Sequence, residues 1–170
     1  MQLFHFSEDP TIERFVPHVP RTNPTQAPAV WAIDEDHQPL YWFPRDCPRV
    51  TAWPRGPGER AAFEVAFSTT APRVHAIEQI WLGRMRATQV YRYTLPTGPF
   101  RPWEDASGQW IAHDEVTPLG VEPLADLVAM HRDAGIDLRA VPNLWPFVDI
   151  AQSGGWDFSI VRIANAQPPD

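Results

Sequence analysis

Prolines are spread along the whole chain, and they limit the length of every helix and strand that it can form. The sequence of 170 residues contains 20 prolines, about twice the usual share. Proline has no backbone N–H, and it disfavours a helical conformation in the residue before it. Because the prolines are scattered, they indicate many sharp connections between short elements and not one disordered tract.

The remaining composition is that of a folded domain. Hydrophobic residues make up 44% of the chain and include eight tryptophans and nine phenylalanines, which offer large apolar surfaces to bury. A chain of this length is long enough for a substantial core. We therefore predict one globular domain over residues 1–170, with aromatic side chains dominating its core.

The charged residues exclude several classes of function. All 14 basic residues are arginines, so no lysine can form a Schiff base. The net charge of −7 argues against a broad nucleic-acid surface or an anionic-membrane surface. A phosphate-bearing ligand would need a local cluster of arginines instead.

Cysteine usage and hydropathy predict a cytoplasmic protein. Cys47 is the only cysteine, so neither an intramolecular disulfide nor a cysteine-rich zinc site is possible. The N-terminus has no basic region followed by an apolar run, and no stretch approaches about 18 consecutive apolar residues. The sequence thus predicts no signal peptide and no contact with a membrane.

Hydrophobic periodicity predicts strands and short helices in alternation. Strands are expected at 3–7, 29–33, 61–67, 89–95, 108–116, 136–141 and 158–163. Helices are expected at 73–86, 123–134 and 144–151, with a short one after Asp34 that reaches Tyr41. Long irregular connections separate these elements. The pattern indicates an α+β domain with a mixed or antiparallel sheet and short helices.

The first strand, Leu3–Ser7, carries two kinds of side chain on its two faces. Side chains alternate along a strand, so His5 and Ser7 share one face, and Phe4 and Phe6 share the other. This arrangement suggests a sheet with an aromatic core face and a polar face that lines a cleft. An edge strand with a solvated polar face is the alternative interpretation.

Other polar groups have both a structural and a functional interpretation. His131 lies on the apolar face of its expected helix, which favours a histidine within the core. Arg45, Asp46, Cys47 and Arg49 are dense enough for an anion site or a low-pKa thiolate. The alternative is an ion network in which Asp46 and the neighbouring arginines hold the proline-rich loop, and we favour this structural interpretation. Cys47 is likewise expected to be structural.

A resemblance to a known fold comes from two segments in the first 45 residues. Leu3–Ser7 resembles the first strand of the histidine-type ADP-ribosyltransferase fold, in which an aromatic-His-x-Ser/Thr strand binds NAD. Residues 29–34 and the short helix to Tyr41 resemble the second motif of that fold. The strand from Trp110 to Glu115 is the candidate for its third, acidic motif. The resemblance implies a split β-sandwich with an NAD-binding cleft.

The resemblance also implies roles for individual residues. His5 would bind the ribose next to the nicotinamide, and Ser7 would hold the carboxamide region. Trp31, which stands where family members usually carry tyrosine, or Tyr41 would stack on the nicotinamide ring.

Charged residues would complete such a site. Asp114 or Glu115 would stabilise the oxocarbenium-like transition state or orient the acceptor. Arg45, with Arg14 and Arg21 as alternatives, would bind the pyrophosphate of NAD.

Two other functions remain open from the sequence. A non-catalytic module for a small-molecule or nucleotide ligand would keep His5 and the aromatic cleft without a well-placed carboxylate. A metal-dependent hydrolase would use His5 and His113, with His37 and Asp114 as further ligands, although no pair has a metal-motif spacing. The whole chain also resembles an uncharacterised bacterial family of about 170 residues.

Overall fold

The computed structural model describes residues 1–20 and 24–169, and these form two compact units. Unit 1 consists of Met1–Trp42 and Gln89–Leu124, and unit 2 consists of Phe43–Thr88 and Ala125–Asp170. The predicted α+β class with mixed and antiparallel sheets and short helices is confirmed. No helix in the described part of the chain is long and apolar enough to cross a membrane.

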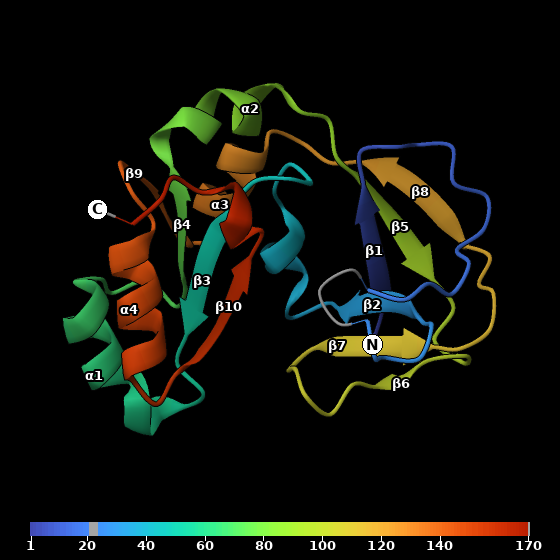
Figure 1. The fold of residues 1–170 in the computed structure, drawn as a ribbon, viewed down its shortest axis with the longest axis horizontal. Helices are drawn as coiled ribbons and strands as arrows, with labels where there is room; N and C mark the ends of the chain where they lie inside the picture. The colour runs from blue at the N-terminus through green and yellow to red at the C-terminus, as the bar shows by residue number, and fades with distance from the viewer. Residues whose placement is uncertain (21–23, 170) are drawn as a thin grey trace. The chain divides into compact units, whose positions relative to one another are not determined.

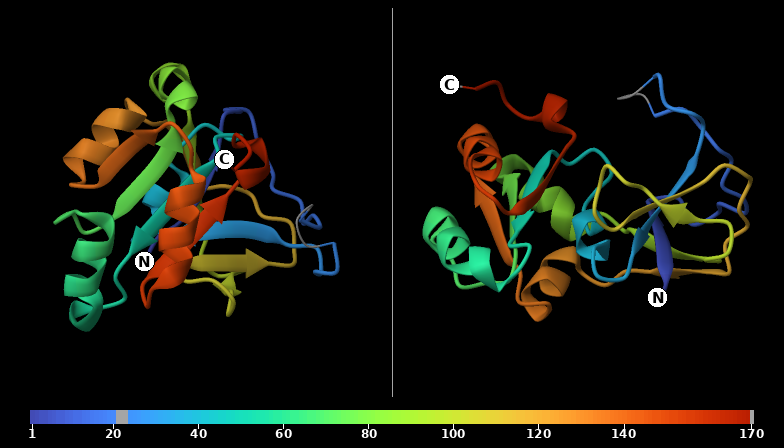
Figure 2. Two further views of the ribbon diagram at one scale, coloured as in Figure 1. Left: turned by 60° about the vertical axis from the view of Figure 1, so that its left-hand side comes forward. Right: turned by 90° about the horizontal axis from the view of Figure 1, so that it is seen from below.

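Unit 1 is built around a six-stranded sheet in the order β6-β7-β2-β1-β5-β8. Its elements are β1 (Leu3–Ser7), β2 (Val30–Asp34), the 3-10 helix η1 (Gln38–Tyr41), β5 (Tyr91–Leu95), β6 (Arg101–Pro102), β7 (Gln109–Ala112) and β8 (Gly120–Pro123). All neighbouring strands are antiparallel. β2 and β7 run side by side in Figure 1 and in the left view of Figure 2.

The core of unit 1 lies on the face of β1 that carries Leu3. This side chain packs with Phe15, Val30 and Tyr93, all of them buried. The Tyr93 hydroxyl accepts a hydrogen bond from the Ile12 backbone N–H at 3.1 Å and donates one to the Asp9 carbonyl at 2.7 Å. Both hydrogen bonds hold the irregular segment after β1 against the core.

Unit 2 combines a four-stranded sheet, in the order β10-β3-β4-β9, with helices (Figure 1). Its elements are β3 (Arg49–Trp53), α1 (Pro57–Phe67), β4 (Val74–Glu78), η2 (Gln79–Trp81), α2 (Leu82–Ala87), α3 (Leu127–Asp133), β9 (Asp137–Val141), α4 (Trp145–Ser153), β10 (Asp157–Val161) and η3 (Ile163–Asn165). β4 and β9 are parallel, and the other pairs are antiparallel.

The segment 61–67, predicted as a strand, belongs instead to helix α1. Phe63 and Phe67 lie four residues apart, so in a helix they share one face, and both are buried. Val65 lies between them and is 81% exposed, which an alternating strand would not allow. Pro57 in the first turn starts the helix, and Ser68 ends it in the left-handed conformation.

The predicted helix 73–86 is also wrong, because its first part is strand β4. All five residues of β4 are buried: Ala76 faces the cluster that contains α4, and His75 faces α3 on the other side. A strand covered on both faces shows no alternation, so its apolar residues also fit a helical period. Only 82–87 is α-helical within this segment.

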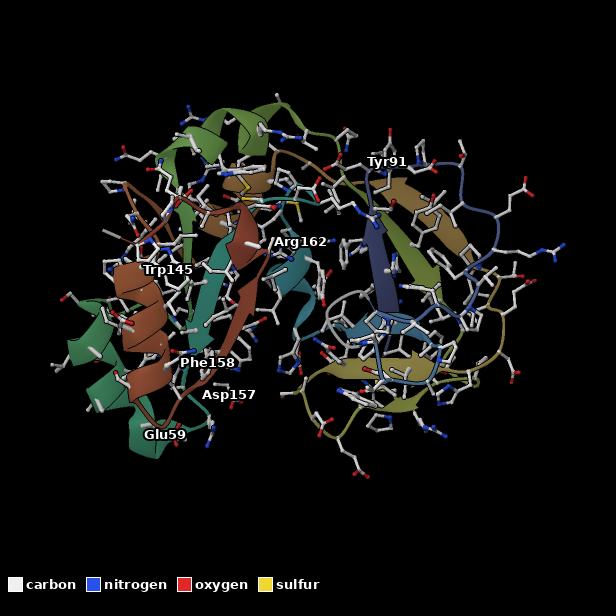
Figure 3. The ribbon with its side chains drawn as sticks, viewed as in Figure 1. Glu59, Tyr91, Trp145, Asp157, Phe158 and Arg162 are labelled. Atoms are coloured by element: carbon white, nitrogen blue, oxygen red, sulfur yellow. The ribbon has the colours of Figure 1, made fainter. Side chains whose placement is uncertain are left out.

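An exposed ion network lies at one end of unit 2. The Arg55 backbone N–H donates to Glu59 Oε2 at 3.0 Å, and Arg55 Nε donates to Asp157 Oδ1 at 2.7 Å. Figure 3 labels Glu59 and Asp157, which lie at the same end of unit 2. Arg55 therefore connects the start of α1 to the start of β10.

Candidate functional site

The sheet of unit 1 opens between β1 and β2. The register of β1 with β5 covers all five β1 residues, whereas its register with β2 covers only Leu3↔Asp34 and Phe4↔Ile33. Beyond Phe4, His5 Nδ1 lies 3.0 Å from the Trp31 carbonyl oxygen. A carbonyl only accepts, so Nδ1 donates, and a side chain replaces the backbone ladder at this point.

A cavity of about 60 Å³ lies at this opening. It is lined by Phe4, His5, Phe6, Trp31, Ala32, Ile33, Tyr41 and Gln109. Its volume is well below the ~300–1,000 Å³ of typical ligand pockets, so only part of a ligand would be enclosed. Five of the lining residues are only partly buried: His5, Phe6, Trp31, Tyr41 and Gln109.

The cavity wall is mostly aromatic. The rings of Phe6 and Tyr41 are parallel within 5°, with their centroids 6.1 Å apart. Trp31 packs edge-on against Trp103 at 5.4 Å, and its buried Nε1 has no hydrogen-bond partner among the residues that the structure describes. Faces of aromatic rings attract flat or cationic groups.

The structure brings three of the predicted site residues to this cavity: His5, Trp31 and Tyr41. Their roles stay predictions. Ser7 is buried, and its hydroxyl accepts a hydrogen bond from the Asp9 backbone N–H at 3.1 Å. Ser7 therefore supports the turn after β1 and does not line the cavity.

The cavity differs from the predicted cleft in its residues. The sequence interpretation placed the cleft on the face of His5 and Ser7, whereas Phe4 and Phe6 from the opposite face line the cavity. The His5 ring packs on Phe15, part of the core on its own face, at 4.6 Å. The alternation of side chains along β1 correctly separated His5 and Ser7 from Phe4 and Phe6. It could not say which face would open to solvent.

The predicted charged residues lie elsewhere in the chain. Glu115 is exposed and pairs with the Arg14 guanidinium at 2.9 Å, and Asp114 is exposed beside it. Neither carboxylate lines the cavity. Arg45 belongs to unit 2 and is exposed, while Arg21 lies outside the described residues.

The candidate metal ligands do not meet in the described part of the chain. His113 Nδ1 lies 2.9 Å from the Pro28 carbonyl oxygen, and its Nε2 contacts the Arg101 guanidinium. His37 binds Asp34 at 2.7 Å. Residues 1–20 and 24–169 contain no group of three His, Cys, Asp or Glu side chains arranged to hold a metal ion.

In unit 2 the predicted core histidine, His131, is fully buried and forms a chain of hydrogen bonds with His75. His131 Nδ1 donates to the Leu127 carbonyl at 2.7 Å, so in the neutral ring Nε2 accepts from His75 Nδ1 at 3.0 Å. Burial lowers the pKa of His131 to about 4 and the pKa of His75 well below its usual value. Both rings are therefore neutral near pH 7.

Cys47 is fully buried, as expected for a structural cysteine. Burial raises the pKa of the Cys47 thiol to about 12, which disfavours a reactive thiolate near neutral pH. The buried Arg49 donates to the Cys47 carbonyl at 3.2 Å, and its guanidinium lies over the Phe43 ring. These contacts hold the proline-rich loop in place.

Residues 4–166 match the family of unknown function DUF6886, so the chain belongs to that family. No curated protein matches the chain. No solved structure matches it either.

Proposed function

We propose that unit 1 binds a nucleotide with a flat, cationic ring, of which NAD⁺ is the leading example. The observation that carries this proposal is that His5, Trp31 and Tyr41 line one cavity where β1 and β2 part. They are three of the residues that the resemblance to the ADP-ribosyltransferase fold assigns to NAD, whereas Ser7 and Arg45, which it also assigns, do not line the cavity. The cavity admits part of the nicotinamide, and the rest of the nucleotide lies outside it.

The chemistry of the cavity suits the nicotinamide end of NAD⁺. The oxidised ring is positively charged, and aromatic faces such as those of Trp31 and Tyr41 attract cations. The Trp31 carbonyl fixes the proton of His5 on Nδ1, so in the neutral ring Nε2 is an acceptor. A ribose hydroxyl can donate to that nitrogen.

We propose binding and not group transfer, because of where the carboxylates lie. Transfer of ADP-ribose needs a negative group near the developing oxocarbenium ion. The two candidates, Asp114 and Glu115, do not line the cavity, and Glu115 is engaged by Arg14. This observation favours the non-catalytic binding module over the transferase.

Calorimetry with NAD⁺, NADH and nicotinamide tests the proposal. NAD⁺ should bind more tightly than NADH, because the reduced ring carries no positive charge. His5→Ala should lower the affinity roughly 10- to 100-fold, as expected from one lost hydrogen bond worth ~1–3 kcal/mol. Of Trp31→Ala and Tyr41→Ala, the variant that removes the stacking ring should weaken binding.

Matched variants in the same unit complete the experiment. His113→Ala removes an exposed histidine that does not line the cavity, and it should leave binding unchanged. Asp114→Asn and Glu115→Gln should also leave it unchanged. Absence of heat with the wild-type protein at millimolar NAD⁺ would overturn the proposal.

A further inference from the structure

The turn after β2 holds a histidine by two contacts to one carboxylate. Asp34 Oδ1 accepts hydrogen bonds from the His37 backbone N–H at 2.9 Å and from His37 Nδ1 at 2.7 Å. The two side chains are 21% and 16% exposed, so the pair is partly shielded from water. The carboxylate therefore fixes both the position of His37 and the orientation of its ring.

Antiparallel pairing brings a serine to the other side of this ring. Ile33 of β2 lies opposite Gln109 of β7, and the Asp34 N–H donates to the Gly108 carbonyl at 2.9 Å. The loop before β7 thus runs beside the end of β2 (Figure 1). The Ser107 hydroxyl oxygen lies 3.2 Å from His37 Nε2, and Ser107 is exposed.

The contacts determine where the protons lie. A carboxylate only accepts, so His37 Nδ1 carries a proton and donates it to Asp34. In the neutral ring Nε2 is then an acceptor, and the Ser107 hydroxyl donates to it. This is the tautomer in which a histidine can remove the proton of a serine hydroxyl.

Gly108 holds the ring at close range. Its φ of +77° is in the left-handed region, and an added Cβ would lie 2.2 Å from His37 Cγ. Only glycine lets the backbone beside Ser107 approach the imidazole this closely. The loop is therefore fitted to the histidine as well as to the sheet.

We infer that Asp34, His37 and Ser107 form a nucleophilic triad that acts on small carboxylic esters. The Ser107 oxygen attacks the ester carbonyl carbon while its proton passes to His37 Nε2, and His37 then protonates the departing alkoxide. Water then attacks the acyl-serine carbonyl while one of its protons passes to His37 Nε2. His37 returns this proton to the Ser107 oxygen as the acid leaves. Overall, one ester and one water give one acid and one alcohol. Asp34 stabilises the His37 imidazolium that forms during acylation and again during deacylation.

This site is distinct from the proposed nucleotide site. None of the three residues lines the aromatic cavity. Asp34, His37 and Ser107 are also not among the residues that the sequence analysis assigned to NAD. The ester activity would stand if NAD⁺ did not bind, and its failure would leave the nucleotide proposal intact.

A fluorophosphonate probe and intact-mass measurement test the triad. The Ser107 oxygen bonds to phosphorus, fluoride leaves, and the proton passes to His37 Nε2, so one adduct should form on Ser107. Ser107→Ala and His37→Gln should abolish labelling, and Asp34→Asn should slow it roughly 10- to 10⁴-fold, as in other triads. Gly108→Ala should also slow it, because it displaces the imidazole while the serine remains.

Controls separate a reactive triad from a hydrogen-bonded turn. Ser153→Ala removes another exposed serine, whose hydroxyl donates to the Ile150 carbonyl, and it should not change the labelling rate. The wild type should also hydrolyse p-nitrophenyl acetate with a burst of one nitrophenolate per chain. Circular dichroism confirms that each variant is folded. Equal labelling of folded wild type and His37→Gln, or absence of a wild-type adduct on Ser107, would overturn the triad.

Discussion

Unit 2 buries several polar side chains in its interior, whereas unit 1 buries almost none among the described residues. Among the described residues, the buried polar side chains of unit 2 are Arg49, Thr51, His75, Glu78 and His131, and unit 1 contributes only Ser7. Buried polar groups lose their water and bind protein atoms instead. Sites for ligands are therefore expected in unit 1, and stability is expected to depend on the interior of unit 2.

The largest effect should come from the aromatic core of unit 2. Phe63→Ala should lower the free energy of unfolding by ~3–5 kcal/mol, because the ring is fully buried between Phe67 and Trp156. Urea unfolding followed by tryptophan fluorescence measures the loss. Val65→Ala, on the exposed side of the same helix, should change it by less than ~0.5 kcal/mol. Trp31→Ala in unit 1 should cost less than Phe63→Ala, and an equal cost would contradict the comparison.

A large kinetic effect is expected at the one cysteine. Cys47 is buried and its pKa is raised to about 12, so a thiol reagent at pH 8 should label the native protein at least ~10³-fold more slowly than a free thiol. Absorbance of the released chromophore measures the rate, and the urea-unfolded protein is the control. Rapid labelling of the native state would show that this part of unit 2 is not a closed interior.

An acid-dependent loss of stability should follow from the two buried histidines. Their pKa values are lowered in the folded state, so below about pH 6.5 the unfolded chain binds protons that the folded chain does not. Stability should therefore fall as the pH drops from about 6.5 to 4, by about 3 kcal/mol for His131 alone. Urea midpoints across this range measure the slope.

Two variants sharpen this test. His131→Gln should make the slope between pH 6.5 and 4 shallower, even though it also destabilises the protein. His113→Gln, which removes an exposed histidine of unit 1, should leave the slope unchanged. If the slope changed in His113→Gln but not in His131→Gln, the acid-dependent loss of stability would not come from the buried histidines.

The smallest effect should come from the surface pair of unit 1. Glu115→Gln should change the free energy of unfolding by less than ~1 kcal/mol, because Glu115 and Arg14 keep 45% and 66% of their side-chain surfaces exposed. Any effect should shrink further in high salt. Thermal unfolding at two salt concentrations measures this change in the free energy of unfolding. A loss above ~2 kcal/mol would mean that the Glu115–Arg14 pair contributes as much to stability as buried groups of unit 2.

The sequence predicts the elements best where their two faces differ. Strand 3–7 and the helix near 144–151 follow their local patterns. The predictions for segments 61–67 and 73–86 were wrong for opposite reasons. Phe63 and Phe67 fit both a period of two and a spacing of four, while β4 is buried on both faces and has no period to detect.

The candidate sites depend on pairings that local patterns do not contain. His5, Trp31 and Tyr41 were selected through a resemblance, but Phe6 and Gln109 enter the cavity only because β1, β2 and β7 are neighbours. Asp34 and His37 are close in sequence, whereas Ser107 reaches them through the β2–β7 register. Gly108 was a usable signal, since a glycine just before a strand often marks a close approach of backbone.

The outer strands of both sheets carry a consequence for how the protein behaves in concentrated solution. Each has at least one charged residue: Arg101 in β6, Glu122 in β8, Asp137 and Arg139 in β9, and Asp157 in β10. β6 and β8 also end in prolines, which cannot donate to an added strand. Charge and proline at an edge oppose the addition of strands from other molecules. The sheets should therefore resist growth into fibrils, although both are rich in aromatic and β-branched residues.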